Sequence, residues 1–259
     1  MKFPKILSKT AYSKYRRELT KNVLSGPIPK HIAIIMDGNR RYASEVLESD
    51  AKEGHRRGEE KIEEMLWWCL DLKIEYVTVY AFSTENFKRG KEEVDFIMKL
   101  SESALYRMAD NDKVHENKVR IRVFGDHATL PDSVKDAIRY ADEKTSSYSD
   151  FHFNVAMAYG SRQEIITAVK DIARKVANKE LEVDDISEET FSDHLYTSDI
   201  PDPDLILRTS GEVRISNFLL WQLAYSELYF TDIYWPGFRY IDFLRAIRSY
   251  QQRVRRYGE

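Results

Sequence analysis

The feature that most constrains the fold is a series of short apolar runs separated by longer stretches with helical periodicity. Because the runs are continuous rather than alternating, they are typical of strands buried on both faces of a parallel sheet. The stretches between them predict helices on both faces of that sheet. The predicted strands are residues 32–36, 77–82, 119–124, 151–156, 205–207 and 228–230. The predicted helices are residues 54–72, 92–108, 131–144 and 162–177.

The chain reads as a single α/β domain. No internal repeat or low-complexity linker interrupts its 259 residues. Residues 1–25 are predicted as a basic helical extension and residues 26–259 as the main domain. The stretch 1–24 carries seven Lys or Arg against one acid. It can be a helix on a membrane surface or a solvated helix packed on the domain, and we favour the second interpretation.

Bulk composition excludes several classes of protein. Hydrophobic residues make up 42% of the chain and the formal net charge is −3, so a large core is expected and nucleic-acid binding is not. No apolar run approaches the roughly 20 residues of a membrane span, and no signal peptide is recognisable. The one cysteine, Cys69, lies in an apolar stretch and is expected to be a buried thiol. We therefore expect a cytoplasmic protein.

The strongest polar motif, Asp37-Gly38-Asn39-Arg40-Arg41, follows the first predicted strand. Ligands of such sheets bind outside the carboxyl ends of the strands. A glycine permits a tight turn, and guanidinium groups match phosphate oxygens. A carboxylate beside a diphosphate indicates Mg²⁺, which takes protein and phosphate oxygens together. The alternative interpretation is a capped surface turn.

Three further polar segments follow the same logic. Residues 54–58 begin a helix, whose N-terminus is an anion site. Residues 80–89 combine apolar rings with hydroxyl and cationic groups at a strand end, as a hydrocarbon diphosphate requires. Residues 208–217 place two arginines around a glycine and predict a second diphosphate site. Taken alone, the histidine of the first segment can equally be a core or capping residue, and the second segment can equally be an aromatic core edge followed by a solvated charged loop.

Glu227 lies in an otherwise apolar stretch. A buried acid is costly unless it is paired or bound to a metal. Its two interpretations, a metal ligand and a salt bridge to an arginine, stay open on this observation alone.

Missing motifs narrow the choice further. The chain has no G-x-x-x-x-G-K-[ST] or G-x-G-x-x-G nucleotide-binding motif and no Cys/His cluster for zinc. It also has no D-D-x-x-D motif. Two diphosphates and one Mg²⁺ would balance the charges at the predicted strand ends.

Together these segments resemble the cis-prenyltransferase family, the undecaprenyl-diphosphate synthases and their relatives. The resemblance spans about residues 30–238, and its most specific part is 214–235 (RISNFLLWQLAYSELYFTDIYW). Arg40, Tyr42, Phe87 and Val213 are more similar to the archaeal and eukaryotic branch than to the bacterial one.

The resemblance implies an enzyme that joins an allylic isoprenoid diphosphate to isopentenyl diphosphate and releases pyrophosphate. It implies a six-stranded, mainly parallel sheet flanked by helices, an apolar tunnel, bound Mg²⁺, a homodimer and peripheral membrane contact for product release. The implied catalytic residues are Asp37, Asn39 and Ser83. The implied substrate-binding residues are Gly38, Arg40, Arg41, His55, Phe82, Arg89, Glu93, Arg208, Arg214 and Ser216. The implied metal-site residues are Asp37 and Glu227.

Three positions depart from the family pattern. Ala51 stands where family members carry an arginine, so one contact to the allylic diphosphate is missing unless Lys52 or Arg56 supplies it. Gly90 stands where a proline is usual. Val213 replaces a bacterial histidine. An irregular condensation, or transfer to a non-isoprenoid acceptor, is therefore an alternative function. A non-catalytic partner subunit is a weaker alternative, because such subunits tend to lack the aspartate found at position 37. Phe151 is expected near the tunnel floor.

Overall fold

The computed structural model of the protein describes the backbone of residues 5–257 and the side chains of residues 12–253. Its centre is one six-stranded sheet with the order β3-β4-β2-β1-β5-β6, in which every neighbouring pair is parallel. The strands are β1 His31–Ile35, β2 Tyr76–Ser83, β3 Val119–Phe124, β4 Phe151–Tyr159, β5 Leu205–Arg208 and β6 Glu227–Phe230. The predicted single α/β domain with a parallel six-stranded sheet is confirmed.

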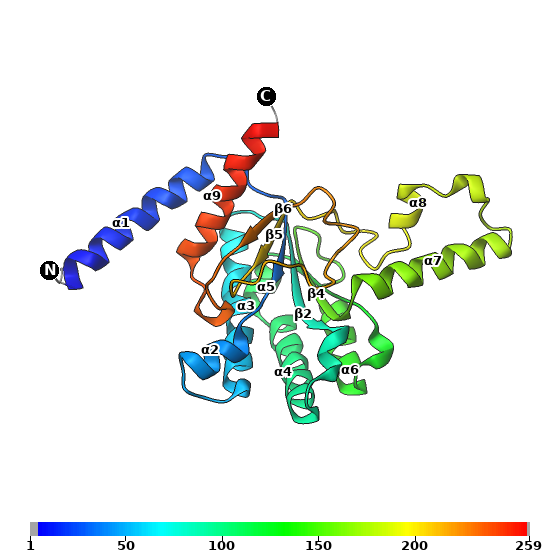
Figure 1. The fold of residues 1–259 in the computed structure, drawn as a ribbon, viewed down its shortest axis with the longest axis horizontal. Helices are drawn as coiled ribbons and strands as arrows, with labels where there is room; N and C mark the ends of the chain where they lie inside the picture. Colours follow the sequence, from blue (N-terminus) through cyan, green and yellow to red (C-terminus); the bar gives the residue numbers. More distant parts are fainter. Residues whose placement is uncertain (1–4, 258–259) are drawn as a thin grey trace.

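In the described chain α1 precedes β1, and each of the other helices comes after at least one strand (Figure 1). The helices are α1 Lys5–Leu24, α2 Asn39–Glu45, α3 Ala51–Asp71, α4 Lys91–Ala109, α5 Asp112–Glu116, α6 Asp132–Thr145, α7 Ser161–Ala177, α8 Glu188–Ser192 and α9 Tyr240–Tyr257. Four 3₁₀ turns accompany them: η1 Thr84–Lys88, η2 His127–Thr129, η3 Val183–Asp185 and η4 Trp235–Gly237. All four helices predicted from periodicity are present, whereas α2, α5, α8 and α9 were not predicted.

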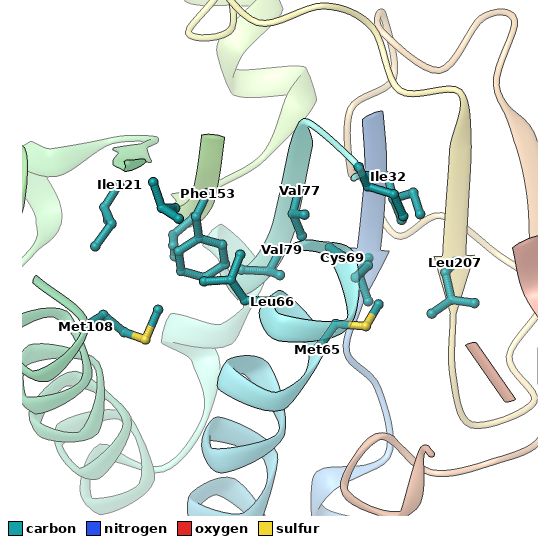
Figure 2. Packing of buried hydrophobic residues seen from close by; sticks show 14 of the residues in the cluster. Ile32, Met65, Leu66, Cys69, Val77, Val79, Met108, Ile121, Phe153 and Leu207 are labelled. Atoms are coloured by element: carbon teal, nitrogen blue, oxygen red, sulfur yellow. The ribbon is translucent and has the colours of Figure 1, made fainter. Parts of the chain in front are cut away.

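Both faces of the sheet are buried, as the continuous apolar runs predict. Along β1, Ile32 and Ile34 belong to the larger core cluster, and Ala33 and Ile35 belong to the cluster on the other face. The larger cluster fills the space between the sheet and the helices, where Figure 2 shows residues such as Leu66 of α3 beside the strand side chains. This alternation is the two-residue period of an extended strand.

The second face differs from the expectation of helical cover on both sides. Its core cluster is completed by Ile200, Phe218 and Leu219, which lie outside the helices of the chain. Phe218 stacks on Tyr80 of β2 with ring centroids 4.5 Å apart. Helix α7 projects away from the body of the molecule instead (Figure 1). Aromatic rings in the connecting segments therefore cover this face of the sheet, as helices cover the first face.

Helix α1 packs on the domain through its C-terminal half, beside α9 (Figure 1). Leu19 and Val23 are buried, and the Gln251 amide of α9 donates to the carbonyl oxygen of Val23 at 2.7 Å. The favoured interpretation of a helix packed on the domain describes this half of α1. The division of the chain at residue 25 stays a prediction.

Two smaller expectations concern burial. Cys69 is a free, buried thiol, and burial raises its pKa, so the predicted structural role is confirmed. Across the part of the chain that the structure describes, no helix combines the length and the apolarity needed to cross a membrane.

The strand order places the site. β1 lies between β2 and β5, so the chain leaves β1 toward one side and returns through β5 on the other. Ligands of open α/β sheets bind at such a switch point, outside the carboxyl ends of the strands. The polar segments that follow β1, β2 and β5 therefore meet at one edge.

Candidate active site

A cleft of 980 Å³ lies at this edge of the sheet. Eleven of the residues predicted for the site line the cleft: Asp37, Gly38, Asn39, Arg40, Arg41, His55, Ser83, Arg89, Arg208, Arg214 and Ser216. Glu93 joins the set by contacting His55 and Arg89. The structure thus brings together side chains from four separate segments of the sequence, as the strand-end argument predicts.

Gly38 is needed by the backbone at the start of α2. Its φ is +101°, and a Cβ there would meet Tyr234 at 2.7 Å and Ser210 at 2.9 Å. Its N–H donates to Asp37 Oδ1 at 2.7 Å. A residue with a side chain would be both strained and in collision, so the turn that presents Asp37 depends on glycine.

Asp37 pairs with a buried arginine from the neighbouring strand. Arg208 Nη2 donates to Asp37 Oδ2 at 2.6 Å, and the arginine side chain is only 4% exposed. Arg208 Nη1 also donates to Ser216 Oγ at 2.7 Å. Thr209 joins the two strand ends, because its hydroxyl donates to the Asp37 carbonyl oxygen at 2.7 Å. A buried guanidinium held this way is a fixed positive charge, and its Nε has no partner among the described residues.

Two more arginines surround Asp37 on the β5 side. Arg41 Nη2 lies 3.6 Å from Asp37 Oδ1, and its Nη1 lies 3.3 Å from Glu212 Oε1. The same Glu212 carboxylate pairs with Arg214. Glu212 therefore holds both guanidinium groups in place at the cleft.

A second cationic group lies on the β2 side. Glu93 Oε1 accepts from His55 Nε2 and from Arg89 Nη1, both at 3.0 Å, and Glu93 Oε2 lies 3.9 Å from Arg40 Nη1. Burial lowers the pKa of His55, partly offset by Glu93 and reinforced by the charges of Arg89 and Arg40. Burial acts to raise the pKa of Glu93, but the His55 hydrogen bond and the two arginines outweigh it and lower that pKa. Glu93 is thus ionised and orients three potential anion ligands.

The segment after β5 holds an unusual backbone. Ser210, Gly211, Ser216, Asn217 and Leu219 all have positive φ, between 47° and 78°. Each non-glycine residue in this region costs on the order of 1 kcal/mol or more, and such strain clusters at functional sites. The strained segment carries Arg214 and Ser216, so the fold sustains an unfavourable backbone at the cleft.

Phe82 does not line the cleft, so its prediction as a substrate-binding residue is not supported. Ala81 and Ser83 on either side of it line the cleft, whereas Phe82 is 1% exposed and packs in the main core. It contacts Phe87 with ring centroids 4.9 Å apart. Burying a large ring in the core gains more than exposing it at a polar cleft.

Glu227 is also misplaced in the prediction. It opens β6 and pairs with Leu205, whereas Arg208 pairs with Phe230, so it lies at the amino ends of the strands. Three residues of strand correspond to about 10 Å. Its carboxylate pairs with Arg253 at 2.8 Å, which is the salt-bridge interpretation. Asp37 and Glu227 therefore do not form a shared metal site within one chain.

The departures from the family pattern can also be placed. Ala51, the first residue of α3, lines the cleft. Arg56 does not replace the missing arginine, because its guanidinium pairs with Glu53 and Glu60 on the outer surface. A Cβ on Gly90 would have no atom within 4 Å, so the position is open. Val213 is 75% exposed.

An apolar cavity of 100 Å³ adjoins the cleft between the sheet, α3 and α4. Five residues line both spaces: Met36, Asn39, His55, Ala81 and Ile97. Strand side chains such as Val79 and Phe153 form the opposite wall, with Phe153 rather than Phe151 in the lining (Figure 2). Polar groups for an anion and apolar walls for a hydrocarbon thus meet at Asn39 and His55.

Sequence reasoning missed two residues of the site. Glu212 contacts Arg41, and Thr209 joins the ends of β1 and β5. The available signal was their position in the arginine-rich segment after β5, but nothing in the sequence says that an acid there has Arg41 as its partner. Such long-range pairs appear only once the strands are ordered.

Comparisons with known proteins agree with this geometry. Residues 35–258 match a family model described as "Putative undecaprenyl diphosphate synthase". A Pyrococcus horikoshii protein, named tritrans,polycis-undecaprenyl-diphosphate synthase (geranylgeranyl-diphosphate specific), is 54% identical over 255 residues, covering 98% of this chain and 96% of its own. A Methanocaldococcus jannaschii protein of the same name is 54% identical over 247 residues, covering 95% and 88%.

Two solved structures have the same fold. Lavandulyl diphosphate synthase from Lavandula x intermedia, solved with dimethylallyl diphosphate, superposes with a TM-score of 0.81 at 38% identity, covering 86% of this chain and 95% of its own. A probable undecaprenyl diphosphate synthase from Campylobacter jejuni superposes with a TM-score of 0.71 at 35% identity, covering 90% and 100%.

Proposed function

Because the chain belongs to the undecaprenyl diphosphate synthase family, the cis-prenyltransferases, we propose that it extends geranylgeranyl diphosphate with isopentenyl diphosphate units to a polyprenyl diphosphate. The observation that carries this proposal is the continuity of an arginine-rich cleft with an apolar cavity. A diphosphate with a long hydrocarbon tail needs both surfaces side by side. The choice of primer follows the names of the archaeal relatives.

The two cationic groups suit two diphosphates. The His55–Arg89 group adjoins the cavity, since His55 lines both spaces. It therefore suits the allylic diphosphate, whose tail would enter the cavity. The Arg208–Arg214–Ser216 group lies across Asp37 and suits isopentenyl diphosphate. Substrate phosphates would take over the arginines that Glu93 and Glu212 hold in the structure.

The reaction breaks the allylic C–O bond and releases pyrophosphate. The double bond of isopentenyl diphosphate forms a new C–C bond at the allylic carbon, and the product then loses one proton. Fixed guanidinium groups stabilise negative charge on the leaving pyrophosphate without reorganising during the step. The apolar cavity excludes water from the allylic cation.

Mg²⁺ fits the residues that are present. Within the described residues, no group of three or more His, Cys, Asp or Glu could hold a metal ion alone. Two acids line the cleft, Asp37 and Glu85; Asp37 lies at the end of β1 beside Arg208 and would hold the ion, so the remaining ligands would be phosphate and water oxygens, as Mg²⁺ prefers. When bound, the ion would neutralise charge on the diphosphates.

The enzyme is proposed to act as a homodimer. β6 is an edge strand of the sheet, and beside it Tyr225 is 99% exposed. Edge strands with exposed aromatic neighbours are usually covered. Light scattering should give twice the chain mass, and Tyr225→Glu should lower it. A monomeric wild-type protein would contradict the dimer.

Peripheral membrane contact, for release of a lipid product, is also proposed. The outer half of α1 projects from the body and its sequence is basic (Figure 1). Sedimentation with vesicles containing an anionic lipid should carry the protein down at low salt, whereas neutral vesicles should not. Equal sedimentation with both would contradict this role for α1.

The assay that tests the function uses radiolabelled isopentenyl diphosphate, Mg²⁺ and one primer at a time. Geranylgeranyl diphosphate should give a series of products that differ by one isoprene unit. It should also give more incorporation than the dimethylallyl, geranyl and farnesyl primers. A single product of irregular linkage, or one formed only with an added alcohol, would favour the alternative suggested by Ala51. No incorporation with any primer would contradict the proposal.

A further inference from the structure

A second hollow of 570 Å³ lies on the outer side of α3 and α4. It is acidic, and its lining consists of Arg56, Glu59, Glu60, Glu63, Glu64, Trp67, Leu100 and Arg107. Three of these residues, Glu59, Glu63 and Leu100, also line the apolar cavity. The same side chains therefore separate the hydrocarbon space from a wet, charged surface groove.

The separating side chains form a connected polar wall, which we define as Glu59, Glu63, Arg107 and Asn111. Arg107 of α4 donates to Glu59 of α3, and its Nε lies 3.8 Å from Glu63 Oε2. Asn111, which caps α5, donates to Glu63 Oε1 at 3.1 Å. The polar wall thus ties α3 to α4 along the cavity.

Glu59 is the more buried of the two acids in the polar wall. Its side chain is 12% exposed, and burial raises its pKa against the opposing effect of Arg107. Near it the cavity lining is apolar, with Ile62, Ala104 and Leu105. A carboxylate in such a place depends on its partner, because a buried charge without one is strongly unfavourable.

The cavity is small beside the cleft, 100 Å³ against 980 Å³. A lengthening tail must therefore displace side chains of α3 and α4. At the polar wall further growth would break the Arg107 ion pairs and push methylene groups into the acidic groove, where they meet water. Both consequences oppose elongation, and neither affects the first condensation at the cleft.

We propose that the polar wall is the stop that limits product length, with Glu59 and Arg107 as its determining pair. This inference rests on the proposed function. It assigns to the two residues a positioning role, because they act on the far end of the tail and touch no reacting atom. Removing both charges together should let the chain grow past the wall.

The test compares two double variants with equal charge changes in the same groove. Glu59→Leu/Arg107→Met removes the polar wall. Arg56→Met/Glu60→Leu removes a neighbouring ion pair that lines only the outer groove. Products from geranylgeranyl diphosphate and labelled isopentenyl diphosphate are resolved by length, and the rate of the first condensation is measured separately in a single turnover.

The polar-wall variant should shift the most abundant product by at least one isoprene unit, with a first-condensation rate within about twofold of wild type. The control variant should give the wild-type lengths. The single variant Arg107→Lys keeps the positive charge and should also give products of wild-type length. It is the second variant to measure if the double variant folds poorly. Unchanged or shorter products from a folded polar-wall variant would overturn the inference. An inactive wild type would instead contradict the proposed function.

Discussion

The polar residues at the two ends of strand β1 differ in charge and in how completely their hydrogen bonds are satisfied. At the amino end, His31 is 2% exposed; its Nδ1 lies 2.6 Å from the Pro201 carbonyl oxygen and its Nε2 2.7 Å from Thr78 Oγ1. Since a carbonyl oxygen only accepts, Nδ1–H donates and Nε2 accepts, which describes a neutral ring with both nitrogens satisfied. Asp204 completes this end by accepting from two backbone N–H groups.

The carboxyl end of β1 is charged and incompletely satisfied. Arg208 Nε and Asn39 Oδ1 are buried there and have no hydrogen-bond partner among the described residues. Asn39 Oδ1 lies against Gly58, where a Cβ would approach it to 2.4 Å. Polar groups left without partners are rare in native proteins and need an explanation. Of the two, the Arg208 N–H can donate to an anion and the Asn39 oxygen can only accept. The difference teaches that one end of the sheet is built for stability and the other for binding a ligand.

If the carboxyl end of β1 serves binding and catalysis, the largest loss of activity is expected from a substitution of Asp37. Asp37→Asn should lower prenyl transfer by roughly 10³-fold, because it removes the carboxylate charge that would hold Mg²⁺ against the diphosphates. The melting temperature should fall, because the neutral asparagine leaves the charge of the buried Arg208 uncompensated even though its oxygen can still accept from Arg208. Steady-state kinetics and a thermal melt measure the two quantities. Asp184→Asn, on an exposed loop, is the control and should leave both unchanged.

The amino end should respond to pH instead. Burial lowers the pKa of His31 from 6.5 to about 4. As the pH falls, His31 takes up a proton in the unfolded chain before it does so in the folded protein. The free energy of unfolding should therefore fall between about pH 6.5 and pH 4. The loss contributed by His31 should reach about 3 kcal/mol. Urea unfolding at several pH values measures it.

Other histidines also titrate in this pH range, so the informative quantity is the difference between wild type and His31→Leu. The burial of His55, His127 and His152 lowers their pKa values in both proteins. The free energy of unfolding of the variant should fall less steeply between pH 6.5 and 4. Parallel curves would show that His31 is not buried in its neutral form.

The same variant should cost stability at neutral pH. His31→Leu removes the hydrogen bonds of His31 to the Thr78 hydroxyl, which keeps only its contact with Asn154, and to the Pro201 carbonyl oxygen. The loss should lower the free energy of unfolding by about 2 kcal/mol. Prenyl transfer at temperatures well below the melting point should stay within about twofold of wild type. A large loss of activity in a folded variant would break the separation between the two ends.

The smallest effect is expected at Gly90, at the rim of the cleft. Its φ and ψ are −56° and 139°, close to the −57° and 149° of Pro131, which caps α6 in the same way. Gly90→Pro should raise the free energy of unfolding by about 0.4–1 kcal/mol by restricting the unfolded chain. Chemical denaturation measures the gain. A decrease would mean that this turn must move or bend in a way proline forbids.

Sequence patterns predicted the strands well because these strands are buried on both faces. Residues 119–124 form β3 as predicted, and the run at 32–36 is shifted from β1 by one residue. The strand-end rule then gathered most of the cleft. It failed for Phe82, whose side chain points into the core rather than into the cleft. It also failed for Glu227, which lies at the amino end of its strand rather than at the carboxyl end.

The remaining features depend on contacts between distant parts of the chain. Glu212 becomes part of the site only because Arg41 lies opposite it. The polar wall joins Glu59 to Arg107 from the next helix along the chain. Charges on an amphipathic helix usually indicate a solvated face, so no pattern in α3 alone distinguishes Glu59 from Glu60. Tertiary packing makes that distinction.

The central claim is that one cleft holds two diphosphates on either side of Asp37, with the allylic tail in the adjoining cavity. The most direct measurement is a crystal structure of the protein with isopentenyl diphosphate and a non-reactive thiolo analogue of geranylgeranyl diphosphate. One diphosphate should lie on Arg208, Arg214 and Ser216, the other on His55 and Arg89, and the hydrocarbon should run between α3 and the sheet. A tail that leaves the cleft toward solvent, or diphosphates bound away from Asp37, would contradict the account.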